Sequence, residues 1–275
     1  MANNIAISVI IPTYKPQEYI WECLDSIKHQ TLSRDKFEVI IVLNGCDEPY
    51  YTQIAEYVGN ELIGYNINFI QTNVGGVSNA RNIALDNAKG EYITFIDDDD
   101  YISPPFLEEL YANASPDTIS LCYPYAFNDG EPGREIPYGL ADVYDNLHGR
   151  VENRLCSSAR KFFSGPCMKL IHRDIIGDRR FDTRYKNGED SLFMFLISDR
   201  IDRVKFTSKK ATYYRRYREG SAVLRKRGRK ERIINNWNCM VEYSKMFFRG
   251  GYSLYFYLSR IAAELRCMLK AIIGV

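Results

Sequence analysis

Apolar and polar positions alternate in blocks along the first hundred residues. Apolar and β-branched runs at 7–11, 37–43 and 92–96, with a shorter run at 67–71, have the length and composition of strands that are buried on both faces. Pro12 ends the first run, and Asn44 with Gly45 ends the second; both are interruptions typical of strand ends. The pattern therefore predicts four strands before residue 100.

The segments between these runs have the spacing of helices. In 17–30 the apolar residues fall three and four positions apart, which places them on one helical face. Helices are also expected at 51–58 and at 78–88, where Ser78 is a candidate N-cap. Strands that alternate with helices in this way indicate βαβ units and a mostly parallel sheet.

Ligands of such sheets bind beyond the carboxyl ends of the strands. Three unusual segments fall there. Pro12, Thr13 and Tyr14 follow the first strand, Asn44 follows the second, and four consecutive aspartates at 97–100 follow the fourth. The sequence therefore predicts an α/β domain with its ligand site at this edge of the sheet.

The charges are distributed unevenly along the 275 residues. Residues 200–275 contain 19 Lys and Arg against 5 Asp and Glu, whereas residues 1–199 contain 17 against 30. A basic C-terminal region favours contact with phosphate groups, nucleic acid or an anionic membrane surface, and it could also be a solvated helical face. We do not expect nucleic-acid binding, because no motif of a nucleic-acid-binding fold accompanies the basic residues.

The remaining composition is that of an ordinary globular protein, with 45% hydrophobic and 26% charged residues. Seven cysteines without C-x-x-C spacing indicate reduced thiols in the cytoplasm, and three scattered histidines argue against zinc catalysis. No segment reaches the roughly 18 apolar residues of a membrane span, and the first residues lack the basic region of a signal peptide. We expect a cytoplasmic protein.

Four adjacent carboxylates raise one another's pKa unless a cation joins them. Mg²⁺ and Mn²⁺ are bound by one or two carboxylates together with substrate phosphates. A calcium loop is excluded, because Tyr101 and Ile102 stand where such a loop requires an oxygen ligand and a glycine. The alternative is an acidic turn that only caps the helix expected after Pro104.

Several motifs together resemble the inverting GT-A glycosyltransferases of family two, which build bacterial capsules, cell-wall decorations and lipopolysaccharide. In chain order these motifs are ISVIIPTYK, CLDSIKHQT, FEVIIV followed by Asn-Gly, NVGGVSNARNIALDNAKGEYITFIDDDD and NGEDSLF. They cover roughly residues 5–220. The resemblance implies a GT-A domain over 1–220, with a nucleotide-binding half over about 1–100 and an acceptor half over about 101–220. A basic, aromatic-rich helical extension would follow at 221–275.

For the donor, the resemblance implies a nucleoside diphosphate sugar, with a uridine diphosphate sugar expected first. Pro12, Thr13 and Tyr14 would line the base pocket, and Arg81 would lie beside the nucleotide or pair with the aspartates. Relatives commonly have an acidic pair after the second strand, one member of which reads uracil. This chain has Leu43 and Asn44 there. Asn44 can still hydrogen-bond a base edge, but the identity of the base stays open.

The acidic residues also receive roles from the resemblance. Asp97 would contact the ribose, Asp99 would hold Mn²⁺ or Mg²⁺, and Asp98 stands where relatives often have serine. Inverting transfer needs one base on the acceptor side. Asp190 in NGEDSLF would be that base, and Glu189 would orient the acceptor.

Four further positions complete the expected site. Lys169 would face the acceptor side, while Arg215, Arg218 and Ser221 would lie on a loop that closes over the diphosphate. The acceptor would be a glycan or a lipid-linked saccharide. The helical tail could pack on the core, form a homodimer, or contact the inner face of the membrane. Alternative functions are nucleotidyl transfer to a sugar phosphate and sugar-nucleotide binding without catalysis.

Overall fold

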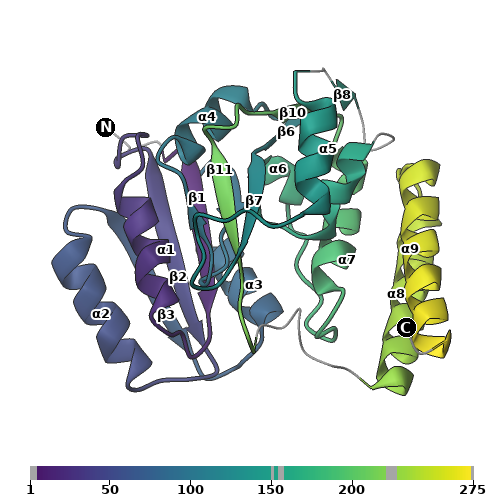
Figure 1. Ribbon diagram of the computed structural model, residues 1–275, viewed down its shortest axis with the longest axis horizontal. Helices are drawn as coiled ribbons and strands as arrows, with labels where there is room; N and C mark the ends of the chain where they lie inside the picture. The colour runs from purple at the N-terminus through teal and green to yellow at the C-terminus, as the bar shows by residue number, and fades with distance from the viewer. Residues whose placement is uncertain (1–4, 150–151, 154–157, 221–227, 274–275) are drawn as a thin grey trace.

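The apolar runs of the first hundred residues form parallel strands, as predicted. The structure is a computed structural model that describes residues 5–149, 152–153, 158–220 and 228–273. The four strands pair in parallel in the order β3-β2-β1-β4; they are β1 (Ile7–Thr13), β2 (Phe37–Asn44), β3 (Asn66–Thr72) and β4 (Tyr92–Phe95). Every residue of β1, β2 and β4 is buried, because both faces of this part of the sheet are covered (Figure 1).

The three predicted helices between these strands are present. They are α1 (Tyr19–Lys28), α2 (Tyr50–Glu61) and α3 (Val77–Asn87). The prediction that Ser78 caps α3 is wrong. Gly76 occupies the N-cap position with φ of 126°, and its backbone N–H donates to Asn44 Oδ1. This hydrogen bond fixes the entry of the chain into the helix before Ser78 is reached.

The main sheet continues beyond β4 into the second half of the chain. Within the described residues it has eight strands in the order β3-β2-β1-β4-β9-β6-β10-β8. The added strands are β6 (Thr118–Leu121), β8 (Glu152–Asn153), β9 (Lys169–His172) and β10 (Arg203–Phe206). β9 runs antiparallel to both of its neighbours, and it therefore joins the two halves of an otherwise mostly parallel sheet.

A smaller sheet lies over the carboxyl end of β4. Its order is β5-β11-β7, with β5 (Tyr101–Ile102), β7 (Tyr123–Asn128) and β11 (Thr212–Tyr217). β5 directly follows the four aspartates and pairs with β11. This pairing brings the arginines of the basic C-terminal region back to the acidic turn.

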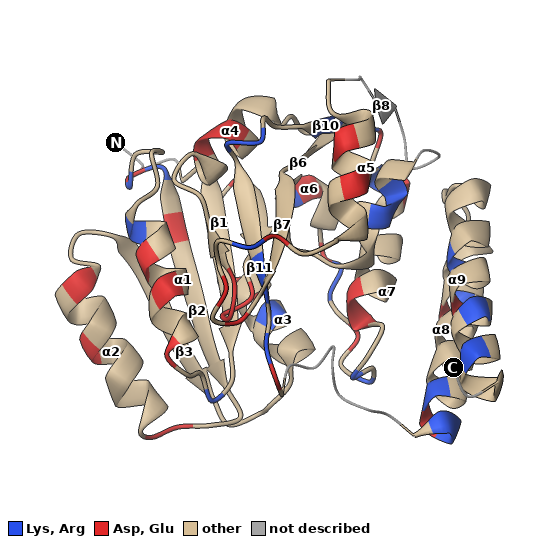
Figure 2. Ribbon diagram, in the orientation of Figure 1, with Lys and Arg blue, Asp and Glu red and all other residues tan. Residues whose placement is uncertain are grey.

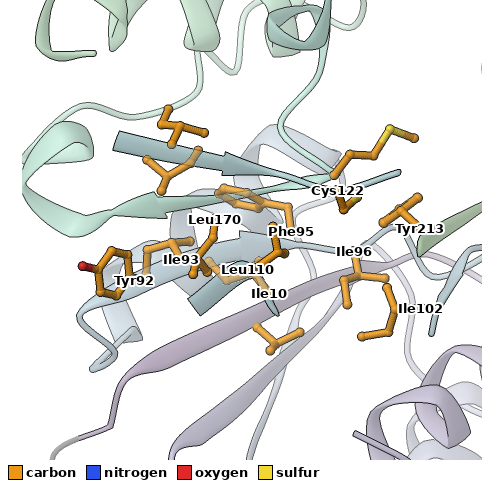
Figure 3. Close-up of a cluster of buried hydrophobic side chains, with 14 of the residues drawn as sticks. Ile10, Tyr92, Ile93, Phe95, Ile96, Ile102, Leu110, Cys122, Leu170 and Tyr213 are labelled. Carbon is orange, nitrogen blue, oxygen red and sulfur yellow. The ribbon is translucent and has the colours of Figure 1, made fainter. Parts of the chain in front are cut away.

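The core is continuous between the two sheets. Figure 3 shows side chains of β1, β4 and β9, such as Ile10, Phe95 and Leu170, close to Ile102 and Tyr213 of the smaller sheet. All five side chains are buried. Burial of each apolar side chain contributes roughly 1.5–3 kcal/mol, so the packing holds the smaller sheet against the ligand edge of the larger one.

Shorter helices cover the second half. They are α4 (Phe106–Asn113), α5 (Gly139–Leu147), η1 (Ser158–Ser164), α6 (Arg173–Ile176), α7 (Glu189–Leu196) and η2 (Ser198–Arg200). No helix among the described residues has both the length and the apolar character needed to cross a membrane.

The predicted helical tail forms a pair of long helices, α8 (Arg229–Phe247) and α9 (Leu254–Ile273), which stand at one end of the molecule (Figure 1). Phe247 stacks on Tyr257 with ring centroids 4.3 Å apart, which joins the two helices. The Tyr243 hydroxyl lies 2.7 Å from Ser191 Oγ of α7, and Tyr252 stacks on Phe195 at 4.9 Å. One side of this helical hairpin therefore packs on the core.

Two glycine substitutions test the packing, with opposite expected signs. A Cβ on Gly90 would lie 2.4 Å from the Ser8 backbone nitrogen, so Gly90→Ala is expected to destabilise the fold by about 1–3 kcal/mol. Gly59 lies inside α2, and its Cβ would meet nothing within 4 Å. Gly59→Ala is therefore expected to stabilise the protein by up to about 1 kcal/mol. Urea unfolding of both variants measures the two effects, and equal shifts would contradict the close approach at Gly90.

Candidate functional site

The carboxyl ends of β1, β2 and β4 meet at one edge of the sheet, as predicted. The Asn44 side chain donates through Nδ2 to the Thr13 carbonyl oxygen at 2.7 Å, which holds the ends of β1 and β2 together. The Thr13 hydroxyl in turn donates to Asp98 Oδ2. Pro12 is buried within β1, and its contact with a base stays a prediction.

Two glycines, Gly45 and Gly75, approach each other closely beside this edge. Gly45 has φ of 65°, and a Cβ placed there would lie 2.7 Å from the Gly75 Cα, so position 45 requires glycine both for its backbone conformation and for this close approach. Tyr14 is 54% exposed beside Gly45, where its ring is open to a planar ligand. Both polar groups of the Asn44 side chain are bonded within the protein, to Thr13 and Gly76. Its contact with a base stays a prediction.

The four aspartates of the turn have four different partners. Asp97 Oδ1 accepts from Arg81 at 2.9 Å, and Asp98 accepts from Thr13. Asp99 and Asp100 accept from two arginines of the C-terminal region. Figure 2 shows the acidic turn in the middle of the molecule, with basic segments of α3 and β11 beside it. The carboxylates coexist because each meets its own donor.

These partners do not fully offset the burial of the four carboxylates and the repulsion among them. Burial, opposed by the Thr13 hydrogen bond and reinforced by the charges of Asp99 and Asp97, raises the pKa of Asp98 to about 7. Burial and the Asp97 charge also raise the pKa of Asp99, against the opposing effect of Arg218. Burial and the neighbouring carboxylates raise the pKa of Asp100 well above its usual range. The turn therefore has an excess of negative charge that an added cation would relieve.

The donor set suits a hard divalent ion, because it consists of carboxylate oxygens. Among the described residues, however, no group of three His, Cys, Asp or Glu side chains converges to hold a metal. An ion at Asp99 would need further oxygens from a bound ligand. Such a shared arrangement is the usual one for Mg²⁺ and Mn²⁺ with phosphates.

Three neighbouring arginines have distinct roles. Arg218 donates through Nε to Asp99 Oδ2 at 2.8 Å and lies over the Tyr19 ring. Arg215 lies on strand β11 rather than on a loop, and it donates to the Tyr138 hydroxyl at 2.8 Å. The prediction of a loop is therefore wrong for Arg215. Ser221 lies outside the described residues.

Arg216 was not among the predicted site residues, yet it holds the acidic turn. Its backbone N–H donates to Asp100 Oδ1 at 2.8 Å, and its Nε donates to the Asp99 carbonyl oxygen at 2.9 Å. Its other nitrogens reach Asp129 and Glu22. The run of arginines is visible in the sequence, but the pairing of β11 with β5 decides which one reaches the turn.

Arg81 joins the acidic turn to the acidic pair of α7. Its Nη2 lies 2.9 Å from Asp97 Oδ1, and its Nη1 lies 2.5 Å from Asp190 Oδ1. The Arg81 side chain is only 3% exposed, and it lies over the Phe181 ring. Burial acts to lower the pKa of Arg81, but the carboxylates of Asp190 and Asp97 outweigh it and raise the pKa. Arg81 is therefore charged and held by both carboxylates.

The acidic pair stands at the start of α7, after Gly188 with φ of 85°. A Cβ on Gly188 would lie 2.8 Å from Cys239 Sγ of α8, so the hairpin packs directly on this motif. Burial, opposed by Arg81 and reinforced by Asp97, raises the pKa of Asp190. Burial and then the Asp190 charge raise the pKa of Glu189 to about 7.

Lys169 is fully buried on β9, between the sheet and the segment that precedes it. Its Nζ donates to the carbonyl oxygens of Gly165 at 2.6 Å and Cys167 at 2.5 Å. Burial lowers its pKa to about 8. Lys169 therefore stabilises this segment, and contact with an acceptor stays a prediction.

A residue of the tail also holds this segment and was not predicted. Arg260 of α9 donates to Ser164 Oγ at 3.1 Å and to the Phe163 carbonyl oxygen. It lies 97 positions from Phe163 along the chain, and no local pattern marks such a contact.

Comparison with known proteins identifies the family. Residues 8–180 match the sequence model of the family described as "Glycosyl transferase family 2". TarS of Staphylococcus aureus, named as a poly(ribitol-phosphate) beta-N-acetylglucosaminyltransferase, is 32% identical over 220 residues, which are 78% of this chain and 36% of TarS. The uncharacterized glycosyltransferase EpsJ of Bacillus subtilis is 33% identical over 213 residues, which are 76% of this chain and 60% of EpsJ. The chain spans about a third of the length of TarS.

Solved structures agree with these relatives. The structure of S. aureus TarS 1-349 in complex with UDP-GlcNAc superposes with a TM-score of 0.71 and 25% identity, over 98% of this chain and 72% of that one. The mannosyltransferase PcManGT from Pyrobaculum calidifontis, in complex with GDP-Man and Mn²⁺, gives 0.64 and 19%, over 98% and 74%. The predicted GT-A fold is confirmed.

The raised pKa of Glu189 predicts how stability depends on pH. The folded protein holds this proton more tightly than the unfolded chain, so the group's contribution to stability is lost as pH rises from about 4.5 to about 7. Glu189→Gln should remove this loss, on the order of 1 kcal/mol per pH unit within that range.

Urea unfolding of both proteins at several pH values between 5 and 8 measures the difference. Glu56→Gln, which changes an exposed carboxylate on α2, is the matched control and should follow the wild type. If Glu189→Gln also follows it, another group titrates there.

Proposed function

The chain belongs to glycosyl transferase family 2, and from this premise we propose that it transfers a sugar from a nucleoside diphosphate sugar to a hydroxyl group of an acceptor by a single displacement that inverts the anomeric carbon. The observation that carries the proposal is the ion-pair bridge Asp97–Arg81–Asp190, with distances of 2.9 and 2.5 Å. It sets a carboxylate suited to a base beside the edge where ligands of α/β sheets bind.

The donor would lie over the close approach of Gly45 and Gly75. The base would stack near the exposed ring of Tyr14, with Thr13 and Asn44 below it, and Asp97 would accept from the ribose. Since Asn44 is bonded to Gly76 and Thr13, a base would be recognised largely by backbone groups around Gly45 and Gly75. UDP-GlcNAc is the first candidate donor, because TarS binds it.

A Mn²⁺ or Mg²⁺ ion would be held by Asp99 and the diphosphate oxygens, and it would neutralise the charge that develops on the leaving nucleoside diphosphate. In the structure Arg218 partly neutralises Asp99. We propose that Arg218 turns from Asp99 to the diphosphate when the donor binds. Arg215, which is held by Tyr138, would support the same anion from β11.

Asp190 would be the base. Arg81 binds its Oδ1, so Oδ2 would take the proton of the acceptor hydroxyl. The acceptor oxygen then forms a bond to the anomeric carbon as the bond from that carbon to the diphosphate oxygen breaks, with the electron pair leaving on the nucleoside diphosphate. Glu189, whose pKa of about 7 keeps a proton available near neutrality, would donate a hydrogen bond to the acceptor.

The acceptor class follows from the relatives by analogy. TarS acts on poly(ribitol phosphate) by its name, so a polyol-phosphate polymer is the first acceptor to try, alongside a lipid-linked glycan. We propose that residues 1–220 form the transferase domain, with its nucleotide half in about 1–100, and that 221–275 extend its acceptor side.

The metal proposal predicts loss of transfer in Asp99→Asn and after EDTA treatment, with a cooperative unfolding transition retained. A panel of sugar nucleotides with Mn²⁺, assayed for release of nucleoside diphosphate and free sugar, identifies the donor. Release of pyrophosphate from sugar phosphate and nucleoside triphosphate would instead indicate nucleotidyl transfer.

Arg218→Ala is the complementary variant. Without its guanidinium on Asp99, Mn²⁺ should bind more tightly in the absence of nucleotide, whereas nucleoside diphosphate should bind about 10-fold or more weakly through lost charge-assisted hydrogen bonds. Calorimetry measures both affinities.

Full activity of Asp99→Asn and of the EDTA-treated protein would refute the role of the metal.

Asp190→Asn tests the base. The amide keeps the shape but accepts no proton, so transfer should fall by ~10²–10⁴-fold. Because buried Arg81 loses a charged partner, we also expect a loss of about 1–3 kcal/mol in stability. Nucleoside diphosphate affinity should change less than transfer does, since Asp97 still holds Arg81.

Glu189→Gln is the matched control for this experiment, and it should reduce transfer less than Asp190→Asn. If Glu189→Gln reduced transfer more than Asp190→Asn does, the base would be Glu189. Complete loss of nucleotide binding in Asp190→Asn would assign Asp190 a structural role.

A further inference from the structure

The exposed apolar side chains of the described chain are concentrated on the helical hairpin. Ten of the fifteen large hydrophobic side chains that are exposed lie between Ile234 and Ile273. We define the outer face by six of them, which are Ile234, Trp237, Phe248, Leu258, Leu265 and Leu269. Leu258, Leu265 and Leu269 follow one another at helical spacing on α9. Such a concentration marks an interaction surface.

The outer face points away from the core. At 3.6 residues per turn, Trp237 lies roughly 200° around α8 from Cys239, and Leu258 lies roughly 200° around α9 from Arg260. Cys239 faces Gly188, and Arg260 holds Ser164. Each helix therefore presents one side to the core and its apolar outer side to the surroundings.

The charges beside this face select its partner. Residues 229–273 contain eight Lys and Arg and three Asp and Glu. Lys245, Arg249, Arg266 and Lys270 are exposed, and Figure 2 shows the blue segments along the hairpin. The acidic Glu242 is largely covered and paired with Lys245 at 2.9 Å. A second copy would bring a like charge against this face, whereas anionic lipid headgroups complement it.

We infer that the outer face docks on an anionic lipid surface, with both helices lying along it. Apolar side chains that enter the headgroup region beside Lys and Arg are typical of interfacial helices. This inference rests on the proposed function, because the docked hairpin would place the acceptor side of a transferase. Tyr243 and Cys239 of α8 touch the segment of Gly188 and Ser191, so the docked hairpin holds the acceptor side ~10 Å from the lipid, about one helix diameter. The acceptor it suits is a saccharide attached to that lipid.

Vesicle co-sedimentation of the full chain tests this. Vesicles of phosphatidylcholine mixed with phosphatidylglycerol should bind the protein, and vesicles of phosphatidylcholine alone should bind it ~10-fold or more weakly. Leu258→Gln with Leu265→Gln, and separately Arg266→Glu with Lys270→Glu, should each weaken binding to the mixed vesicles ~10-fold or more. Ile63→Gln with Tyr111→Gln, exposed apolar residues outside the hairpin, is the matched control and should bind as the wild type does.

Three outcomes overturn the docking surface: equal binding to both vesicle types, no binding to either, or a dimer in sedimentation that the leucine variant abolishes. Donor hydrolysis without vesicles is measured on every variant. A protein that binds mixed vesicles but hydrolyses no donor contradicts the proposed function alone. One that hydrolyses donor but ignores vesicles contradicts the docking surface alone.

Discussion

The constraint on which the site depends is the repulsion among four carboxylates at the end of one buried strand. Burial and mutual repulsion raise the pKa values of Asp98, Asp99 and Asp100, so the turn must be stabilised by donors from elsewhere. The donors come from β1, α3 and the C-terminal region, as Thr13, Arg81 and Arg216 with Arg218. Three separate parts of the chain are therefore drawn to one turn. The remaining excess of negative charge suits a site that binds a divalent ion only together with its anionic ligand.

Arg81 converts this local arrangement into a connection between two halves of the molecule. A guanidinium can bind two carboxylates with separate nitrogens, which an ammonium does with less geometric control. Arg81 does so from a buried position, with one nitrogen on Asp97 and another on Asp190. Protonation of Asp190 would leave the charge of Arg81 to Asp97 alone. In the proposed reaction, protonation of Asp190 would therefore strengthen the interaction of Arg81 with Asp97, which lies on the nucleotide side.

Local patterns predicted the strands, the helices between them and the aspartates at the ligand edge, because apolar runs and helical periodicity are encoded within a few residues. Contacts between distant segments were not predictable in the same way. Strand alternation separates Arg215 from Arg216, but only the pairing of β11 with β5 and β7 decides that Arg216 meets the turn. Arg260 holds the Phe163 carbonyl oxygen from 97 positions away along the chain, a contact that no local pattern marks. Ser78 was a reasonable cap by composition, but Asn44, from another strand, fixes the helix start at Gly76.

The C-terminal hairpin shows why composition alone misjudges an extension. Its basic and aromatic residues suggest an independent appendage, yet Gly188 has no room for a Cβ beside Cys239, and Arg260 holds the segment before Lys169. A helix that packs on Gly188 and Ser191 beside the acidic pair and exposes Trp237 on its other side cannot change its orientation without moving both. Whatever binds the outer face therefore sets the position of Asp190 relative to that partner. On a lipid surface, the depth at which the hairpin lies would also determine the distance between Asp190 and the lipid, because the hairpin packs beside Asp190 and also contacts the lipid.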